Sequence, residues 1–453
     1  MLRRFLAAAF AVLALHIPAA PASAQVVGPV GAAILGAPDP YQGTVLAIDF
    51  AGVKTSGVPR YQLGATRYVS FTDVPGLSVS RPSTEYAEQL DGSLVSFASN
   101  IPAITNNGLA VWEARTNLLL QSNTFSTSWI AENASATANA TTAPDATNTG
   151  WKLLENSSTA TQHDYAQVVS KAASAITYTA TIYAKAAERT WMNFQASDAV
   201  ANGNRFFFNL STCAADTISN IGAGFASPTF SASAKVNGWC RLSITFTSNT
   251  GTSVAIVPML ALDHSTTSYA GDGVSGAFIF GATLEQASFA SPYNPTTSAT
   301  ATRAADSISI SGLSVPTPYT LVAGVSLPVR LGGDFITSTP DLHNSQGIYY
   351  SGSVRSFVVV ADVIVANPGA IVAPALGTPF GAAARFQTND VNVAASRVLG
   401  SHVTSVTPLS MTTLGFGPNP NGGFSGGYPD GFIRRAVVYP RAFSDTELQG
   451  ASQ

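Results

Sequence analysis

The chain has 453 residues, of which 46% are hydrophobic and only 10% are charged, and its formal net charge is -3. This length suggests two or three domains, and the hydrophobic content is ample for packed cores. The composition offers no basic stripe for nucleic acid and no polybasic patch for an anionic membrane, so we expect neither as a partner.

Residues 1–24 have the pattern of an export signal. Its parts are a positive region at Arg3 and Arg4, an apolar run over 5–17, and the small-residue cleavage site Ala22-Ser23-Ala24 before Gln25. The alternative is a membrane anchor, but an apolar run of about 13 residues is short for a bilayer, which needs about 20. We therefore expect a cleaved signal peptide and a secreted, cell-surface or periplasmic protein without membrane insertion.

The remaining composition predicts an all-β protein with tandem antiparallel β-sandwiches. Ser, Thr, Ala, Gly and Asn are abundant, and short runs of β-type residues alternate with turn-prone sequence. Residues 25–112 begin with a Gly-, Pro- and Ala-rich linker and continue with strand-like runs at 44–50 and 66–71. This leader is too short and turn-rich to be a confident domain alone, and we expect it to pack against the C-terminal domain.

Residues 108–129, GLAVWEARTNLLLQSNTFSTSW, join this leader to a second β-rich region. The phrase resembles one that recurs in bacteriophage tail-associated and tail-fibre-like proteins, where it opens a jelly roll similar to carbohydrate-binding modules. Residues 269–306 resemble the closing phrase of the same module. The resemblance implies a jelly-roll domain at 113–303 and an ancestry among glycan-binding proteins.

Strands in this central region split into two faces because successive side chains point to opposite sides. One face is apolar and forms the expected core. The other mixes aromatic, amide and cationic side chains, and its candidate carbohydrate-binding residues are Trp191, Asn193, Gln195, Tyr183, Lys185, Arg205, Phe207 and Arg241. A sugar ring stacks on an aromatic ring while its hydroxyls bond to amides and charges. The alternative is an ordinary solvated face, since outer faces of sandwiches also carry such residues.

Cys213 and Cys240 are the two cysteines of the chain, and each lies next to a strand-like run. An exported protein favours a disulfide between them, with the two runs as neighbours in one sheet, over two buried free thiols. Zinc is not expected because two cysteines without a nearby His pair supply too few ligands. Jelly-roll sugar binders often hold a structural Ca²⁺, but Asp272 and Glu285 belong to no dense carboxylate cluster, so we assign no metal ligands and expect no other cofactor.

Residues 304–453 predict a second series of strands that ends in one short helix. Ser444-Asp445-Thr446-Glu447 is a capping box, which should start that helix. Residues 431–449, GFIRRAVVYPRAFSDTELQ, resemble the terminal strand and helix of concanavalin-A-like, laminin-G-like lectin domains. The resemblance implies a lectin-type sandwich at 304–453.

No catalytic constellation is apparent in the sequence. The four His outside the signal are scattered, no G-x-S-x-G motif is present, and no strand carries closely spaced paired carboxylates. We therefore expect an exported, non-enzymatic glycan-binding or adhesion protein of phage-tail-like type, with a polysaccharide or cell-surface glycan as partner. The alternatives are a polysaccharide-cleaving enzyme or its accessory subunit, and a purely structural surface or virion component. The sequence does not indicate the oligomeric state.

Overall fold

The computed structural model describes residues 39–52, 57–329, 332–368, 375–420 and 427–453. Within these ranges the chain consists of antiparallel strands and one short α-helix near its C-terminus, which confirms the predicted all-β sandwich fold. Residues 43–453 form one compact unit. The predicted export signal lies outside the described residues.

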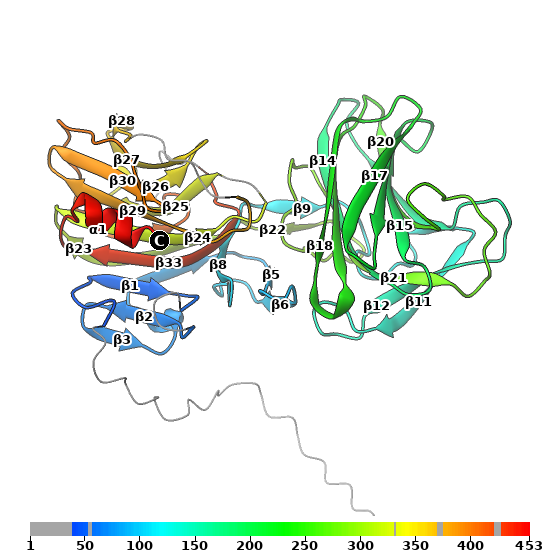
Figure 1. The fold of residues 1–453 in the computed structure, drawn as a ribbon, viewed down its shortest axis with the longest axis horizontal. Helices are drawn as coiled ribbons and strands as arrows, with labels where there is room; N and C mark the ends of the chain where they lie inside the picture. The colour runs from blue at the N-terminus through cyan, green and yellow to red at the C-terminus, as the bar shows by residue number, and fades with distance from the viewer. Residues whose placement is uncertain (1–38, 53–56, 330–331, 369–374, 421–426) are drawn as a thin grey trace, which may run out of the picture. The chain divides into compact units, whose positions relative to one another are not determined.

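The central sandwich consists of two six-stranded sheets, drawn mainly in cyan and green in Figure 1. The first sheet has the order β10 (Ile130–Glu132), β13 (Asp164–Ser170), β20 (Ser253–Ala261), β15 (Trp191–Ser197), β16 (Gly203–Asn209) and β17 (Ala214–Ile221). The second has the order β11 (Ala134–Thr141), β12 (Gly150–Glu155), β21 (Gly276–Glu285), β14 (Thr177–Ala186), β19 (Cys240–Thr247) and β18 (Ala226–Ala234). A 3-10 turn, η2 (Val236–Gly238), connects β18 to β19.

The core of this sandwich follows from the alternation of side chains along its strands. In β19 every second residue is buried, and Leu242 and Ile244 are fully enclosed. Phe194 and Phe206 from the first sheet belong to the same apolar cluster. Burying side chains of this size contributes about 1.5–3 kcal/mol each, which fixes the register of both sheets.

The predicted disulfide between Cys213 and Cys240 is present, with the two Cα atoms 5.3 Å apart. Its place in the fold differs from the expectation that the cysteines flank neighbouring elements of one sheet. Cys213 lies in the turn between β16 and β17, whereas Cys240 begins β19 of the opposite sheet. The bond therefore links the two sheets of the sandwich.

The second sandwich contains the C-terminal strands. Its seven-stranded sheet has the order β28 (Val363–Ala366), β27 (Val354–Val360), β26 (Ser345–Tyr350), β25 (Gly333–Thr339), β32 (Met411–Phe416), β23 (Ser307–Val315) and β4 (Leu77–Ser80). The other sheet has the order β3 (Thr66–Tyr68), β2 (Arg60–Leu63), β1 (Leu46–Asp49), β33 (Gly431–Tyr439), β24 (Tyr319–Ser326), β29 (Phe380–Gln387), β30 (Asp390–Ala395) and β31 (Val398–Leu399). In addition, β8 (Gly108–Val111) pairs with β33, and β7 (Ile104–Thr105) pairs with β8.

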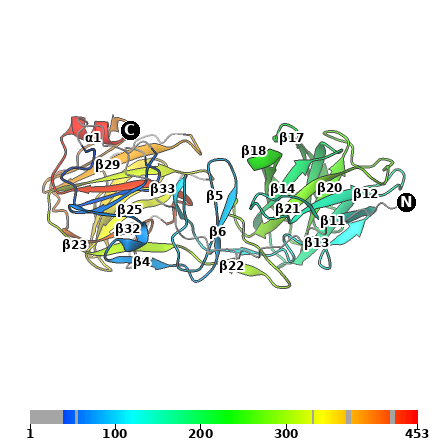
Figure 2. The same ribbon diagram turned by 90° about the horizontal axis from the view of Figure 1, so that it is seen from below.

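Leader strands are hydrogen-bonded partners of C-terminal strands in both of these sheets. Ile48 of β1 lies opposite Ala436 of β33, and β8 pairs with the start of the same strand. In the other sheet, Val79 of β4 lies opposite Ile308 of β23. Figure 2 labels these two strands. A 3-10 turn, η1 (Phe71–Asp73), precedes β4. The leader and the C-terminal segment therefore share one apolar core.

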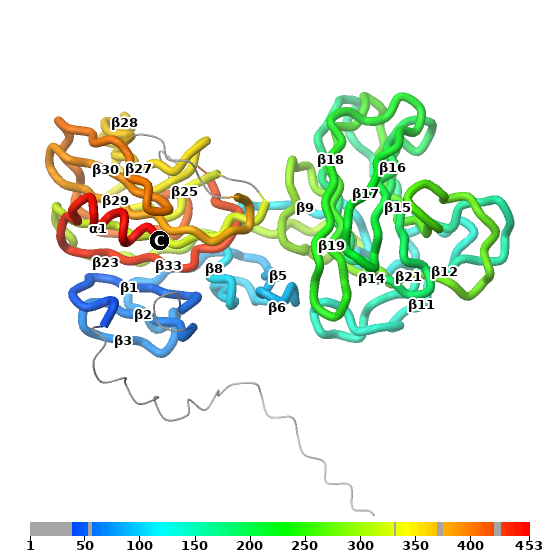
Figure 3. The backbone as a smooth tube through the Cα atoms, viewed as in Figure 1, coloured from blue at the N-terminus to red at the C-terminus, as the bar shows by residue number. Residues whose placement is uncertain are grey.

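The chain passes from the leader into the central sandwich and back through two short paired strands, β9 (Arg115–Asn117) and β22 (Ala301–Arg303), which can be followed in Figure 3. The hairpin formed by β5 (Glu85–Glu88) and β6 (Leu94–Phe97) precedes this passage. Arg81, which precedes this hairpin, and Asp306, which follows β22, form a fully buried ion pair with 2.9 Å between nitrogen and oxygen.

The helix α1 (Asp445–Ala451) begins where the capping box predicts. The Ser444 hydroxyl accepts a hydrogen bond from the Glu447 amide, and the Glu447 carboxylate accepts one from the Ser444 amide. Among the described residues, no helix has both the length and the apolar character needed to cross a membrane.

Candidate functional site

The structure does not bring the eight predicted sugar-binding residues together. Trp191, Asn193 and Gln195 on β15, with Arg205 and Phe207 on β16, belong to the first sheet of the central sandwich, whereas Tyr183 and Lys185 on β14 and Arg241 on β19 belong to the second. The eight residues would share one face only if β14 packed alongside β15, and it does not, because the short connection between these consecutive strands crosses from one sheet to the other. The predicted residues therefore form two separate groups.

The Trp191 group is only partly accessible. Asn193 is fully buried, where its amide donates to the Met259 sulfur over 3.5 Å and its oxygen accepts a hydrogen bond from the Phe206 amide. Phe207, its register partner, is also buried. The prediction that these two side chains contact a ligand is therefore not compatible with their positions. Three members remain partly exposed: Trp191, Gln195 and Arg205.

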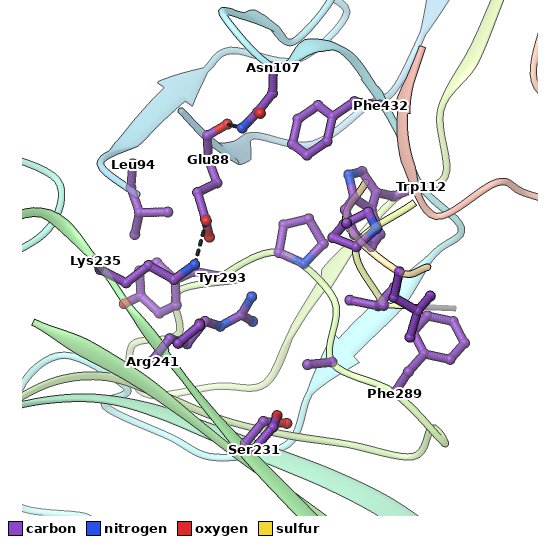
Figure 4. A pocket seen from close by; sticks show the side chains of 18 of the residues that line it. Glu88, Leu94, Asn107, Trp112, Ser231, Lys235, Arg241, Phe289, Tyr293 and Phe432 are labelled. Carbon is purple, nitrogen blue, oxygen red and sulfur yellow. Dashed lines mark hydrogen bonds and ion pairs between the residues drawn. The ribbon is translucent and has the colours of Figure 1, made fainter. Parts of the chain in front are cut away.

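The Tyr183 group borders a cavity of about 590 Å³, shown in Figure 4. Tyr183 and Arg241 line this cavity, and Lys185 is not among its lining residues. The walls come from the outer face of β18 and β19, the β5–β6 hairpin, the segment 288–293, and residues near Trp112 and Phe432. The volume lies within the range of small-molecule sites, about 300–1,000 Å³.

The β5–β6 hairpin is held over the central sandwich by apolar and polar contacts. Leu94 belongs to one buried cluster with Tyr183, Trp239 and Tyr293. The Leu94 amide donates to the Pro144 carbonyl over 3.0 Å. These contacts place the end of β5 beside the cavity, where the Asn107 side chain donates to the Glu88 carbonyl over 2.9 Å.

Tyr183 presents a buried hydroxyl that has no hydrogen-bonding partner among the described residues. Its ring packs at 6.0 Å from Phe280 and 6.4 Å from Tyr293. Burial raises the pKa of the hydroxyl, and the positive charge of Arg241 opposes part of that rise. The phenol is therefore neutral at physiological pH and able both to donate and to accept a hydrogen bond.

Arg241 lies directly opposite Tyr183 in the pairing of β19 with β14, and its guanidinium carbon is 5.7 Å from the Tyr183 ring centroid. Its Nη2 donates to the Ser291 carbonyl, while its buried Nε has no partner among the described residues. Ser291 is itself fixed, since its hydroxyl donates to a Glu285 oxygen over 2.6 Å. The carboxylate thus supports the arginine through Ser291.

The other charged side chains at the cavity are paired with each other. Lys235 and Glu88 form an ion pair, which Figure 4 shows on the side opposite Trp112 and Phe432. Burial lowers the pKa of Lys235, and the charge of Arg241 lowers it further, whereas Glu88 opposes both effects. Because Glu88 stays close, Lys235 remains a cation with its charge largely compensated.

A double row of hydroxyl-bearing side chains leads along the cavity toward Arg241. Thr229 of β18 lies opposite Thr245 of β19, and Ser231 lies opposite Ser243. The next pair on the same face, two positions along the strands, is Ser233 and Arg241. All four hydroxyl residues of the first two pairs line the cavity, and the two on β18 are exposed. The row offers several donors and acceptors on a rigid sheet.

The far wall is aromatic. Trp112 and Phe432 meet edge to face with their centroids 6.4 Å apart, and Phe289 lies on the same side in Figure 4. Trp112 is only 4% exposed, and its indole Nε1 has no partner among the described residues. Sequence reasoning missed Trp112 and Glu88, although Trp112 stands within the phrase at 108–129 that carried the resemblance.

Within the described ranges no group of three or more His, Cys, Asp or Glu is arranged to hold a metal ion. Asp272, considered above for calcium, closes a turn instead, because its carboxylate accepts hydrogen bonds from the amides of Val274 and Ser275. Glu285 bonds to Ser291. Neither carboxylate has the setting of a calcium ligand.

No protein-family model matches the chain. No curated protein matches it either. Among solved structures, a Trypanosoma rangeli sialidase in complex with sialic acid is 9% identical, with 83% of this chain and 98% of that chain covered and a TM-score of 0.21. Trypanosoma rangeli sialidase in complex with the inhibitor DANA is 8% identical, with 90% and 97% covered and a TM-score of 0.22.

The sequence-based expectation that the chain is not an enzyme is contradicted by this comparison, because the structures found are sialidases, which are enzymes. A non-enzymatic role is therefore not carried further. At TM-scores of 0.21 and 0.22 the likeness assigns no fold, activity or substrate to this chain.

Proposed function

We propose that the protein binds a glycan in the cavity beside Tyr183 and Arg241. The observation that carries the proposal is that one cavity is lined by three residues with a buried polar atom that has no partner among the described residues: Trp112 Nε1, Tyr183 Oη and Arg241 Nε. A buried polar group without a partner costs about 1–3 kcal/mol. A ligand rich in hydroxyl groups would offset that cost at each of these atoms with which it forms a hydrogen bond.

The remaining walls suit the same class of ligand. Sugars present an apolar face that packs on aromatic rings and a rim of hydroxyls that needs donors and acceptors. Phe289 and Phe432 offer ring surface, and Ser231 and Ser243 offer hydroxyls on adjacent strands. The disulfide supports an exported protein that meets polysaccharides or cell-surface glycans, since such bonds persist in oxidising compartments.

A glycan array probed with residues 25–453 tests the proposal, together with a variant that fills the cavity. Ser231→Trp places an indole at an exposed, cavity-lining position of β18 without disturbing the core. The matched control is Ser135→Trp, because Ser135 is exposed on β11, the other edge strand of the same sheet, and does not line the cavity.

The expected result is specific binding by the wild type and by Ser135→Trp, and loss of that binding in Ser231→Trp. Equal binding by both variants would place any glycan site elsewhere on the molecule. Absence of binding to every glycan on the array would refute the proposed function.

A further inference from the structure

The charge at the cavity points to a narrower class of ligand. Resting on the proposed function, we infer that the glycan is anionic and that a carboxylate or sulfate group of the sugar is bound by Arg241. The inference rests on which donors and charges of the cavity are already used within the protein and which are not.

Arg241 has no carboxylate within 4.0 Å among the described residues, unlike Arg189, whose Nη2 pairs with Glu155, and Arg385, whose Nη2 lies 2.8 Å from Asp390. Within the described part of the chain, Arg241 donates one hydrogen bond, and its acceptor is the neutral carbonyl of Ser291. The Nε atom, which takes part in the two-point binding of planar anions by arginine, has no partner among the described residues.

Summing the charged lining residues gives the cavity a positive balance. Among the described residues these are Lys235 and Arg241, which are cations, and Glu88, which is a carboxylate. Glu88 compensates the charge of Lys235, with which it forms an ion pair. Glu285 acts on Arg241 through Ser291, and Arg241 in turn opposes the rise that burial causes in the pKa of Glu285. The unbalanced charge at the cavity therefore belongs to Arg241.

An anionic sugar would use this charge and the neighbouring hydroxyls together. The acid group would accept from the Arg241 guanidinium and from Tyr183 Oη, since the two residues are register partners on β19 and β14. Its ring hydroxyls would then meet Ser231 and Ser243, the register pair next to Ser233 and Arg241 on the same face of these two strands. A neutral sugar would meet the hydroxyls but would leave the guanidinium charge uncompensated.

The alternative is that Arg241 serves only the fold, by resting on the Tyr183 ring and holding Ser291. In that case the affinity of a glycan would not depend on its charge. The two interpretations therefore differ in how binding responds to the acid group of the ligand, a property that a purely structural arginine does not control.

The experiment is calorimetric titration of residues 25–453 with matched oligosaccharides: a neutral one, its uronic-acid counterpart, the methyl ester of that uronate, and a sulfated form. We expect the uronate or the sulfated sugar to bind about tenfold or more tightly than the neutral and esterified sugars, since hydrogen bonds to charged groups are the stronger ones. Whichever of the uronate and the sulfated sugar binds more tightly identifies the acid group. The ratio of its affinity to that of the neutral sugar should shrink as salt is added.

Arg241→Gln should remove this preference while leaving the weaker binding of the neutral sugar. Lys152→Gln is the matched control, since it deletes a cation from the same sheet at a position outside the cavity, and it should retain the preference. The comparison of the uronate with its methyl ester uses the wild type alone. It therefore still tests whether binding depends on the charge of the acid group if Arg241→Gln does not fold.

Equal affinities for neutral and charged sugars would overturn the anionic assignment and leave the proposed function standing. No binding of any sugar, neutral or charged, would overturn both. Binding of inorganic sulfate or citrate as strong as that of the charged sugars would also overturn the assignment, because the site would then recognise the anion and not the glycan.

Discussion

Tyr183 and Arg241 lie opposite each other in the antiparallel pairing of β14 and β19, and each has a buried polar atom without a partner among the described residues. Strand pairing alone places these two side chains next to each other, because directly opposed residues on one face are about 4.5–5.5 Å apart at Cβ. The wall that encloses them is supplied by the hairpin β5–β6 and the segment around Phe289.

The disulfide should contribute substantially to the stability of the central sandwich. Cys213 and Cys240 are 27 positions apart, and closing a loop of that length in the unfolded chain is worth about 3–4 kcal/mol. The double variant Cys213→Ala with Cys240→Ala should lose about this amount in urea unfolding of residues 25–453. A loss below about 1 kcal/mol would contradict the argument that the bond stabilises the protein by restricting the unfolded chain.

Asp164 should make the protein less stable as pH rises. Burial, and then the charge of Glu132, raises the pKa of the Asp164 carboxyl to about 7. Because the folded pKa lies above the unfolded value of about 3.9, the native state favours the protonated acid, and this contribution is lost between about pH 4 and pH 7 at up to about 1.4 kcal/mol per unit.

Asp164→Asn removes this titration, so its stability should fall less than that of the wild type over the same interval. Urea unfolding at several pH values measures the difference. Glu132→Gln, which removes the neighbouring charge opposite Asp164 and keeps the acid, should leave a smaller pH dependence than the wild type. Parallel stability curves for Asp164→Asn and the wild type would contradict the argument.

Trp191 remains a predicted contact for a glycan on the other face of the sandwich. It is partly exposed, meets His264 edge to face at 6.2 Å, and lies on the same strand as Gln195, whose buried Oε1 has no partner among the described residues. Trp191→Ala should weaken binding of a polysaccharide that the wild type recognises by about 1–3 kcal/mol.

The comparison for stability is Trp239→Ala, because Trp239 is fully buried and its indole donates to the Thr142 carbonyl over 3.0 Å. That truncation should cost about 3–5 kcal/mol of folding stability, and Trp191→Ala should cost clearly less. An equal loss of stability in the two variants would make Trp191 structural. Unchanged binding in Trp191→Ala would show that this face does not contribute to glycan binding.

The sequence predicts the local features of this fold well. The capping box at Ser444 starts the helix, and the alternation in β19 correctly separates Leu242 and Ile244 from the outer face. Strands such as β11 and β18 were missed, since they are rich in Ala, Ser and Thr and lack the run of large β-branched or aromatic residues that marks a strand.

Alternation along a strand predicts which side chains share a face but not which sheet the strand joins. For that reason Tyr183 was correctly placed off the core of its sandwich and wrongly placed beside Trp191. The cavity itself was beyond sequence reasoning, because Glu88 reaches Lys235 across 147 positions of the chain, through a hairpin whose docking depends on tertiary contacts. The predicted boundaries at 112 and 303 remain predictions.

The most direct test of the account is Tyr183→Phe, measured for both thermal unfolding and glycan affinity. The substitution keeps the ring and removes only the hydroxyl, which has no partner among the described residues. Tyr178→Phe is the matched control on the same strand, since its ring lies in the apolar core and does not line the cavity.

If the hydroxyl serves a ligand, Tyr183→Phe should leave the unliganded protein as stable as the wild type or more stable, since a buried polar group without a partner costs about 1–3 kcal/mol. The same variant should weaken glycan binding by about 0.5–1.5 kcal/mol, the worth of one hydrogen bond, while Tyr178→Phe leaves the affinity unchanged. Undiminished glycan binding by Tyr183→Phe, or a clear loss of stability without its ligand, would contradict the account.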